Sequence, residues 1–334
     1  MSKHCGCEKK HHHKKEHKKC NKKCDRKCKY QCDIIHKDGY IVTDAIDTKI
    51  YYKLDGPKCG QVILMVHSLM TDHRTYNMIV CELQRKYLCL AIDLRGFGKS
   101  SQYNNPDLYK EELWVNDILA VINYFGYKNI VYLGTCFGAF LGTNLLYNHV
   151  NYFSKFVFVG PTPKLIQQLT GPNPWPYGIS PTDFAGVSGL LPAQKEKYIN
   201  TMNDIAYVGD RPQEYLNKLK EQNFKYLNDA NVIAMMQTDA VYAAADNRNI
   251  IVPSDVPVFL FWGTKDGFFP NVEEPLFERT HNTNSHFTEF IQMGHPVYEL
   301  DPIKFLKEFV TAIETNGVDE KYRLLCCPAY PDQQ

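Results

Sequence analysis

The chain has 334 residues, of which 44% are hydrophobic and 22% are charged. This composition is ordinary for a globular protein and excludes a wholly disordered or fibrous one, while the length suggests one large domain or two smaller ones. The formal net charge of +1 hides an asymmetry, because residues 1–32 carry a net charge of +9 and residues 33–334 carry −8. The sequence therefore divides into a basic tail and an acidic body.

The tail, residues 1–32, contains almost no aliphatic side chains, so it has too little apolar surface to offset the entropy lost on folding. We expect a disordered basic tail that is attracted to acidic partners. The alternative is a metal site, because four cysteines recur at every fourth residue and would form one stripe along a helix. These candidate ligands are Cys20, Cys24, Cys28 and Cys32. They lack the second, distant ligand pair of familiar zinc sites.

Signals for export or membrane insertion are missing from the sequence. The N-terminus has no apolar stretch of the kind that a secretory signal peptide needs, and we expect no membrane-spanning segment. Without export, thiols normally stay reduced, and the six cysteines of the body are spread too thinly for a disulfide framework. We therefore predict a soluble, intracellular protein with reduced cysteines.

The body begins near Asp33 and has the pattern of an α/β protein. Residues 42–54 alternate apolar and polar side chains, which is typical of an edge hairpin. Short, fully apolar runs then alternate with helical periods, as in a mostly parallel sheet covered by helices. The predicted strands are 62–66, 88–92, 130–133, 156–159, 258–262 and 287–291. The predicted helices are 76–87, 113–125, 137–149 and a last helix that begins at Asp301-Pro302 and ends near Glu314.

One long interval breaks the alternation of strands and helices. It separates the strand at 156–159 from the strand at 258–262, begins with proline-rich loops and continues with helical stretches. These stretches are 193–203, 212–223 and 230–245. A helical insertion that follows the C-terminal end of a strand is where a lid over a ligand crevice belongs. We therefore predict a core of residues 33–160 and 246–316, a helical lid of residues 161–245 and a C-terminal tail of residues 317–334.

The segment that carries most chemical information lies between the strand at 130–133 and the helix that starts at 137. Its residues Gly134-Thr135-Cys136-Phe137-Gly138 match the G-x-S-x-G nucleophile elbow with Cys in place of Ser. Gly134 and Gly138 would let the strand and the helix pass closely. The N-terminus of the helix would stabilise negative charge on Cys136. The alternative is a buried structural cysteine in a chance match.

Two upstream segments complete a resemblance to the α/β-hydrolase superfamily, in particular to its lid-bearing lactonase-, esterase-, epoxide-hydrolase- and haloperoxidase-like enzymes. Residues 93–100, DLRGFGKS, resemble the D-x-R-G-x-G-x-S segment of that family, and His67 resembles its H-G-x segment, with Ser68 where the family has Gly. The resemblance implies an α/β-hydrolase fold with a helical lid inserted after the sixth strand. It also implies an oxyanion hole formed by the backbone N–H groups of Leu69 and Phe137, with His67 in support.

In this family an acid and a histidine follow the nucleophile in chain order. Asp266 lies just after the predicted strand at 258–262, and His295 lies in a Gly-His pair after the last predicted strand. The resemblance therefore implies a catalytic triad of Cys136, Asp266 and His295. Each of the last two residues, taken alone, would be interpreted as a turn aspartate or a loop histidine.

A cysteine in the elbow resembles the dienelactone hydrolases of the superfamily. A thiol beside a histidine and a helix N-terminus ionises readily and attacks carbonyl carbon atoms. We therefore predict a hydrolase of an ester, lactone or thioester, with a small acyl-bearing substrate in an apolar pocket under the lid. The alternatives are an acyltransferase with the same triad and a catalytically inactive binding protein of the same fold. The mechanism needs no cofactor, and we expect no metal in the body.

Overall fold

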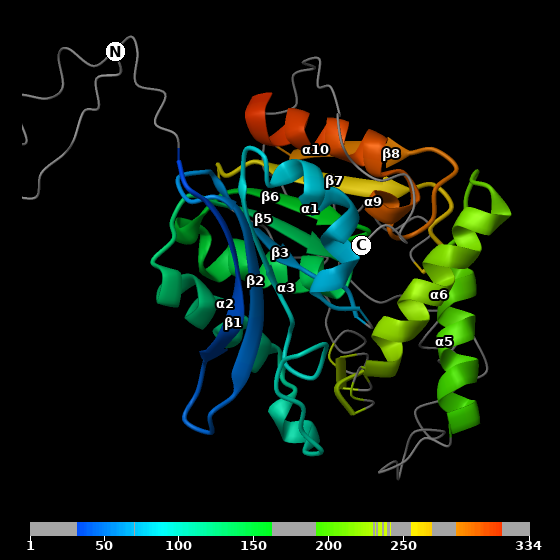
Figure 1. The fold of residues 1–334 in the computed structure, drawn as a ribbon, viewed down its shortest axis with the longest axis horizontal. Coiled ribbons are helices and arrows are strands. Elements are labelled where there is room, and N and C mark those ends of the chain that lie inside the picture. The colour runs from blue at the N-terminus through cyan, green and yellow to red at the C-terminus, as the bar shows by residue number, and fades with distance from the viewer. Residues whose placement is uncertain are drawn as a thin grey trace, which may run out of the picture. The chain divides into compact units, whose positions relative to one another are not determined.

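The computed structural model describes residues 32–69, 71–161, 192–229, 231, 233–235, 237–238, 241, 255–268 and 285–315. The chain divides into two units, Met1–Asp33 and Ile34–Gln334, and the strands and helices that follow belong to the second (Figure 1). The strands are β1 (Ile34–Val42), β2 (Lys49–Pro57), β3 (Val62–Val66), β4 (Leu88–Ile92), β5 (Ile130–Thr135), β6 (Phe153–Val159), β7 (Val258–Gly263) and β8 (Ser285–Phe290).

The helices lie between these strands and after the last one. The α-helices are α1 (Asn77–Leu83), α2 (Glu111–Phe125), α3 (Phe137–Asn148), α5 (Pro192–Ala206), α6 (Gln213–Asp229), α9 (Val297–Leu300) and α10 (Pro302–Thr315). The 3₁₀ helices are η1 (His73–Tyr76), η2 (Pro106–Leu108) and η3 (Val150–Tyr152). Asp301 caps α10 as predicted, because its carboxylate accepts a hydrogen bond from the backbone N–H of Lys304 at 3.0 Å.

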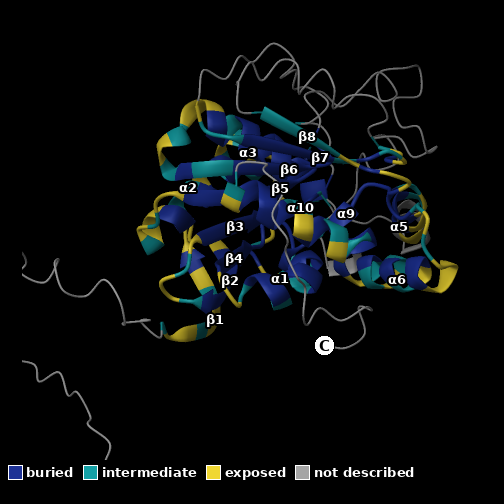
Figure 2. Ribbon diagram, turned by 90° about the horizontal axis from the view of Figure 1, so that it is seen from above, coloured by how far each residue is buried: buried dark blue, intermediate teal, exposed yellow. Residues whose placement is uncertain are grey.

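The central strands are buried on both faces, which explains why they are continuous apolar runs in the sequence. Successive side chains of a strand point to opposite faces of the sheet. In β3, Leu64 and Val66 belong to one apolar cluster together with side chains of α2 and α3. Ile63 and Met65 belong to a second cluster, which includes side chains of α1, α9 and α10. The sheet is therefore covered by helices on both faces, and its strands are buried between them (Figure 2).

The order of the strands determines where a site can form. The sheet has eight strands in the order β1-β2-β4-β3-β5-β6-β7-β8, antiparallel from β1 to β4 and parallel from β4 to β8. The chain leaves β3 for β4 on one side and later returns to pair β5 on the other side, with Val66 opposite Gly134. Such a switch point at the carboxyl ends of parallel strands is where ligands bind in open α/β sheets.

The predicted α/β fold is confirmed, but the predicted edge hairpin was misplaced. Residues 42–54 were expected to form it, whereas the paired strands are β1 and β2 with a turn between Val42 and Lys49. Most of β1 is exposed and mixes apolar and polar residues, so the hydrophobic pattern of the sequence does not indicate a strand there. The strand β1 therefore depends on its pairing with β2 and not on an apolar pattern of its own.

The expectation of reduced cysteines throughout was wrong. Cys32 and Cys59 are disulfide-bonded, while Cys81, Cys89 and Cys136 are reduced. The expectation rested on the missing export signal, which does not determine the oxidation state of an individual cysteine. A sulfur in a disulfide is not a thiolate ligand, so Cys32 is not available to the predicted tail metal site. The other candidate ligands, Cys20, Cys24 and Cys28, lie outside the described residues.

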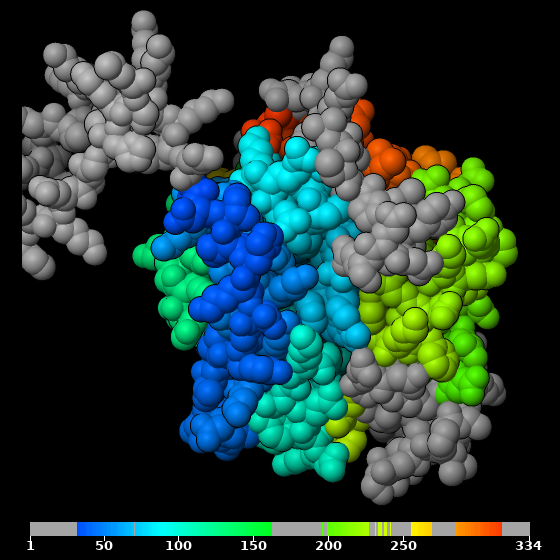
Figure 3. Space-filling model, viewed as in Figure 1, coloured from blue at the N-terminus to red at the C-terminus, as the bar shows by residue number. Residues whose placement is uncertain are grey.

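The long interval between β6 and β7, here called the insertion, contains α5 and α6. These helices match the predicted stretches 193–203 and 212–223, whereas most of 230–245 lies outside the described residues. In the space-filling view, the green surface of α5 and α6 lies on the side away from the blue β1–β2 hairpin (Figure 3). None of the described helices combines the length and the apolar character that are needed to cross a bilayer.

A buried ion pair between Arg95 and Asp117 connects the loop after β4 to α2. The Arg95 guanidinium is 1% exposed and binds both carboxylate oxygens of Asp117, with Nε–Oδ2 and Nη2–Oδ1 distances of 2.6 and 2.7 Å. The same guanidinium donates to Asp44 at 3.1 Å and to the Leu108 carbonyl at 3.2 Å. The pair therefore joins the turn between β1 and β2, the loop after β4 and α2 in one network.

We expect Asp117→Ala to destabilise the protein by about 3–5 kcal/mol, because it leaves the buried Arg95 charge without its bidentate partner. The matched control is Glu214→Ala, which breaks an exposed pair with Lys218 (N–O distance 3.7 Å) and should cost less than about 1 kcal/mol. Urea denaturation of both variants measures the two losses. Equal losses would contradict the role of the Arg95–Asp117 pair.

Candidate active site

Cys136 occupies a strained turn between β5 and α3. Its backbone has φ 50° and ψ −109°, a conformation that non-glycine residues rarely adopt. The turn is held on both sides, because the Cys136 N–H donates to the Val159 carbonyl at 2.9 Å and the Cys136 carbonyl accepts from Phe140 N–H at 2.9 Å. The thiol is 6% exposed and lies at the N-terminus of α3. This is the geometry of a nucleophile elbow.

The two glycines of the elbow are required by close backbone contacts. A Cβ at Gly138 would lie 2.1 Å from the Val66 carbonyl oxygen, and a Cβ at Gly134 would lie 2.6 Å from the carbonyl oxygen of Gly138. The start of α3 therefore packs directly against the ends of β3 and β5. Because of this packing, the Cys136 side chain is held at the carboxyl end of the sheet.

His295 and Asp266 come from the loops that follow β8 and β7. Nδ1 of His295 lies 2.7 Å from Oδ2 of Asp266, and the other carboxylate oxygen accepts from the Phe268 N–H at 2.9 Å. Both side chains are buried, and the Phe268 ring packs edge-on against the imidazole with 5.0 Å between ring centroids. The carboxylate therefore orients the imidazole through Nδ1.

The charge state of His295 depends on both of its neighbours. Burial alone would lower the pKa of His295, but the negative charge of Asp266, the nearby Cys136 side chain and the hydrogen bond between Nδ1 and Asp266 raise it well above the usual value. The raised pKa therefore reflects how close the Asp266 carboxylate and the Cys136 side chain both lie to the imidazole. The structure thus brings together all three residues that the sequence predicts as a triad.

Gly160, at the end of β6, is a site residue that the sequence analysis did not identify. It has φ +52°, and a Cβ there would lie 2.6 Å from Cε1 and 2.8 Å from Nδ1 of His295. The same Cβ would approach Oδ2 of Asp266 to 3.3 Å. The only signal in the sequence is a glycine directly after an apolar strand, which is common in loops. Its importance follows from contacts with residues more than a hundred positions away.

The loop after β3 contains the remaining predicted residues. Nε2 of His67 accepts a hydrogen bond from the Leu94 N–H at 2.9 Å, so Nδ1 carries the proton and donates to the Ser68 carbonyl at 2.6 Å. Burial lowers the pKa of His67 despite the opposing charge of Asp93, so the ring is neutral. His67 therefore fixes the backbone directly before Leu69, the residue predicted to donate to the oxyanion.

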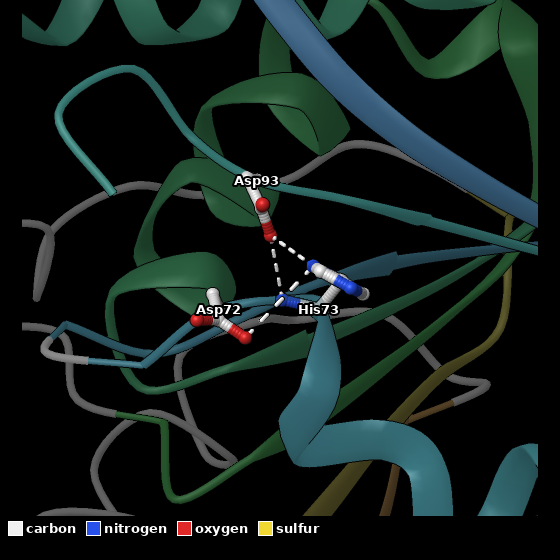
Figure 4. A group of neighbouring side chains, drawn as sticks. All are labelled: Asp72, His73 and Asp93. Atoms are coloured by element: carbon white, nitrogen blue, oxygen red, sulfur yellow. Dashed lines mark hydrogen bonds and ion pairs between the residues drawn. The ribbon is translucent and has the colours of Figure 1, made fainter. Parts of the chain in front are cut away.

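A second buried cluster, Asp72, His73 and Asp93, has the composition of a metal site (Figure 4). Its donor atoms already have partners, however. Oδ1 of Asp93 accepts from both the backbone N–H and Nδ1 of His73 at 2.7 Å, and Oδ2 accepts from the Lys99 N–H at 2.8 Å. Both oxygens of Asp72 accept from the Arg74 side chain. We therefore assign the cluster to holding the loops after β3 and β4 together.

Cys136 is part of an apolar cluster that extends into the insertion. Cys136 belongs to the apolar cluster that includes Ile199 and Met202 of α5, and the partly buried Leu69 and Phe268 pack against that cluster. Ile199 and Met202 lie three residues apart and so share one face of α5. The insertion therefore contributes an apolar helix face to the cluster that contains Cys136.

Comparisons with known proteins agree with this geometry. The sequence profile of the alpha/beta hydrolase fold family matches residues 61–302. Epoxide hydrolase 3 of Xenopus tropicalis is 28% identical over 111 residues, which are 33% of this chain but only 30% of the epoxide hydrolase. A pimeloyl-[acyl-carrier protein] methyl ester esterase of Vibrio cholerae is 21% identical over 221 residues, which are 66% of this chain and 81% of the esterase.

A likeness to a solved structure extends over most of the described fold. The crystal structure of a hydrolase from Pseudomonas aeruginosa PA01 superposes with a TM-score of 0.72 and 15% sequence identity, covering 84% of this chain and 99% of that chain. At this identity the likeness supports the fold alone. The family profile, the sheet order and the elbow lead to one conclusion, as the sequence predicted: this chain belongs to the α/β-hydrolase fold family and is one of its enzymes.

Proposed function

We propose that this protein hydrolyses an ester, lactone or thioester through Cys136, His295 and Asp266. The observation that carries the proposal is geometric: Cys136 lies in a strained turn at the N-terminus of α3, and Nδ1 of His295 lies 2.7 Å from Oδ2 of Asp266 at the same end of the sheet. The raised pKa of His295 agrees with this arrangement. The similarity to a methyl ester esterase favours a carboxylic ester among the three substrate types. The strained elbow supports a nucleophilic role, since strain in the backbone is concentrated at functional positions.

The first half of the reaction forms a thioester. The Cys136 thiolate attacks the carbonyl carbon of the substrate, and the resulting oxyanion is stabilised by the backbone N–H groups of Leu69 and Phe137 and by the N-terminus of α3. The tetrahedral intermediate collapses as the bond to the leaving group breaks. The protonated imidazole of His295 donates its proton to the leaving alkoxide or thiolate, and the acyl group remains on sulfur.

The second half of the reaction restores the enzyme. Neutral His295 accepts a proton from water, and the hydroxide attacks the thioester carbon in the same oxyanion hole. Collapse breaks the carbon–sulfur bond, so the acid leaves and the thiolate faces the imidazolium again. Asp266 retains its charge throughout and stabilises the imidazolium, as its 2.7 Å contact with Nδ1 allows.

We further propose that the insertion is a lid over an apolar acyl pocket. The support is the apolar face of α5, on which Ile199 and Met202 lie in the same cluster as Cys136. Leu69 and Phe268 pack against that cluster from the loops after β3 and β7. An apolar acyl group is the part of a substrate that such surroundings favour, because its burial removes apolar surface from water.

We expect Cys136→Ala to lower the hydrolysis of p-nitrophenyl acetate by at least about a thousandfold, because the nucleophile is lost. The matched control is Cys81→Ala, which removes another reduced, half-buried thiol on α1 and should retain full activity. Release of p-nitrophenolate followed by absorbance measures both rates. A burst without turnover in the wild type would favour acyl transfer to another acceptor, and release that does not depend on Cys136 would favour an inactive binding protein.

Gly160→Ala should reduce kcat/KM on the order of a hundredfold, because the new methyl group displaces the imidazole of His295. Gly126→Ala is the control, since Gly126 has a similar φ of +68° but nothing within 4 Å of the added Cβ. Both variants should lose about 1–2 kcal/mol of stability from the left-handed backbone. The account of the site would be wrong if the two variants had equal activity.

The pH dependence of kcat/KM should reflect the raised pKa of His295. Because the imidazolium protonates the leaving group, activity on the alkaline side should fall only at pH values well above 6.5, the ordinary value for histidine. Asp266→Asn removes a charge that raises this pKa, so the alkaline limb should move to lower pH. Asp107→Asn, on the exposed η2 segment, should leave the profile unchanged. An alkaline limb that does not move in Asp266→Asn would contradict the assignment of this limb to His295.

A further inference from the structure

A buried carboxyl group lies one helical turn beyond His295. Glu299 of α9 is 5% exposed, and its carboxylate accepts hydrogen bonds from hydroxyl groups on two separate parts of the fold. Thr75 of η1 donates to Oε1, and Tyr207, the residue after α5, donates to Oε2 at 2.6 Å. The carboxylate therefore joins the loop after β3 to the base of the insertion.

Residues 206–208, at the C-terminal end of α5, are here called the base of the insertion, and the loop that contains Gly294 and His295 is called the histidine loop. The base of the insertion also binds the histidine loop. The backbone N–H of His295 donates to the Ala206 carbonyl at 3.1 Å, and the Gly294 N–H donates to the Val208 carbonyl at 2.8 Å. Both neighbours of Tyr207 are thus bonded to the backbone of the histidine loop, while the Tyr207 side chain reaches Glu299. Any shift of this segment relative to α9 would move His295.

The network continues to the residue before the nucleophile. The Thr75 hydroxyl lies 2.9 Å from the hydroxyl of Tyr298, and the ring of Tyr298 packs against Tyr76 with 5.3 Å between centroids. The hydroxyl of Tyr76 lies 3.1 Å from Oγ1 of Thr135, which directly precedes Cys136. Glu299 therefore lies at the centre of the contacts that relate the elbow, the histidine loop and the insertion.

Burial raises the pKa of Glu299 to about 7, although the hydroxyls of Thr75 and Tyr207 and the charge of His295 oppose the shift. The titratable groups that face it from the surrounding elements are Tyr76, Tyr207, Tyr226, Tyr298 and His295. Burial raises the pKa of each of these tyrosines, so all four are neutral when Glu299 ionises. Among these groups, His295 alone offers a charge of opposite sign.

We propose that Glu299 is a positioning residue for His295, which anchors the insertion to the histidine loop and stabilises the protonated imidazole; this inference rests on the proposed function of His295. When Glu299 is ionised, its charge favours the imidazolium that donates a proton to the leaving group. Its hydrogen bond with Tyr207 links that charge to the base of the insertion. Glu299 touches no reacting atom, and it acts through His295 alone.

The test is Glu299→Gln, which keeps the shape of the side chain and removes its charge. Two measurements are made at each pH: the Cε1 proton resonance of His295 by NMR and kcat/KM for methyl butyrate, whose leaving alkoxide needs the proton of the imidazolium. We expect the pKa of His295 to fall on the order of one unit, and the alkaline limb of kcat/KM to move down by the same amount. Titration curves identical to those of the wild type would overturn the inference.

Two tyrosine variants complete the experiment. Tyr207→Phe removes one donor to the carboxylate and should shift both profiles in the same direction by a smaller amount, so it carries the test if Glu299→Gln does not fold. Tyr215→Phe is the matched control, because its hydroxyl donates to the backbone carbonyl of Glu299 at 2.6 Å and not to the carboxylate. Its profiles should match the wild type. A shift in Tyr215→Phe equal to that in Tyr207→Phe would indicate a merely structural effect and contradict the proposal.

The NMR titration separates this inference from the proposed function, because it requires no turnover. If Cys136→Ala hydrolyses the ester as fast as the wild type, the proposed function fails whatever the titration shows. If Cys136→Ala is inactive and Glu299→Gln leaves the His295 titration unchanged, the triad stands and only the role of Glu299 is refuted. A shifted titration together with an unshifted kcat/KM profile also refutes that role.

Discussion

The imidazole of His295 is held by the carboxylate of Asp266 at the end of the sheet that also carries Cys136, and the surrounding residues keep it in that position. Nδ1 lies 2.7 Å from Oδ2 of Asp266, and both side chains are buried, so little water weakens their attraction. Gly160 leaves the space that the ring occupies. The sulfur is fixed by the strained backbone of Cys136. A buried charge of this kind is retained only where its partners are held in place.

The sheet provides that rigidity. The three groups follow β5, β7 and β8, so their separation depends on the parallel pairing of these strands through β6. The insertion then contacts this edge in two ways, through the apolar face of α5 and through the hydrogen bonds of residues 206–208 with the histidine loop. Changes in the insertion can therefore reach His295 through the backbone as well as through the apolar cluster. Glu299 lies where these contacts converge.

Much of the fold and the turn at Cys136 could be predicted from local sequence patterns, whereas Asp266 and His295 were predicted through the resemblance to the α/β hydrolases. The strands at 62–66 and 88–92 are buried on both faces and so form continuous apolar runs. The elbow places the end of a strand, two glycines and the start of a helix within a few consecutive residues. Gly160 and Glu299 gave no comparable signal, because their roles arise from contacts distant in sequence. The disulfide at Cys59 was also missed.

The central claim is that an acyl group is carried on the sulfur of Cys136. It is tested most directly by quenching the reaction with acid during turnover and locating the acyl group by peptide mass spectrometry. The account predicts one acetyl group on the peptide that contains Cys136, released by neutral hydroxylamine as a thioester should be. With p-nitrophenyl acetate as the substrate, an acetyl group on another residue would contradict the account. A burst of p-nitrophenolate with no acetyl group on any peptide would also contradict it.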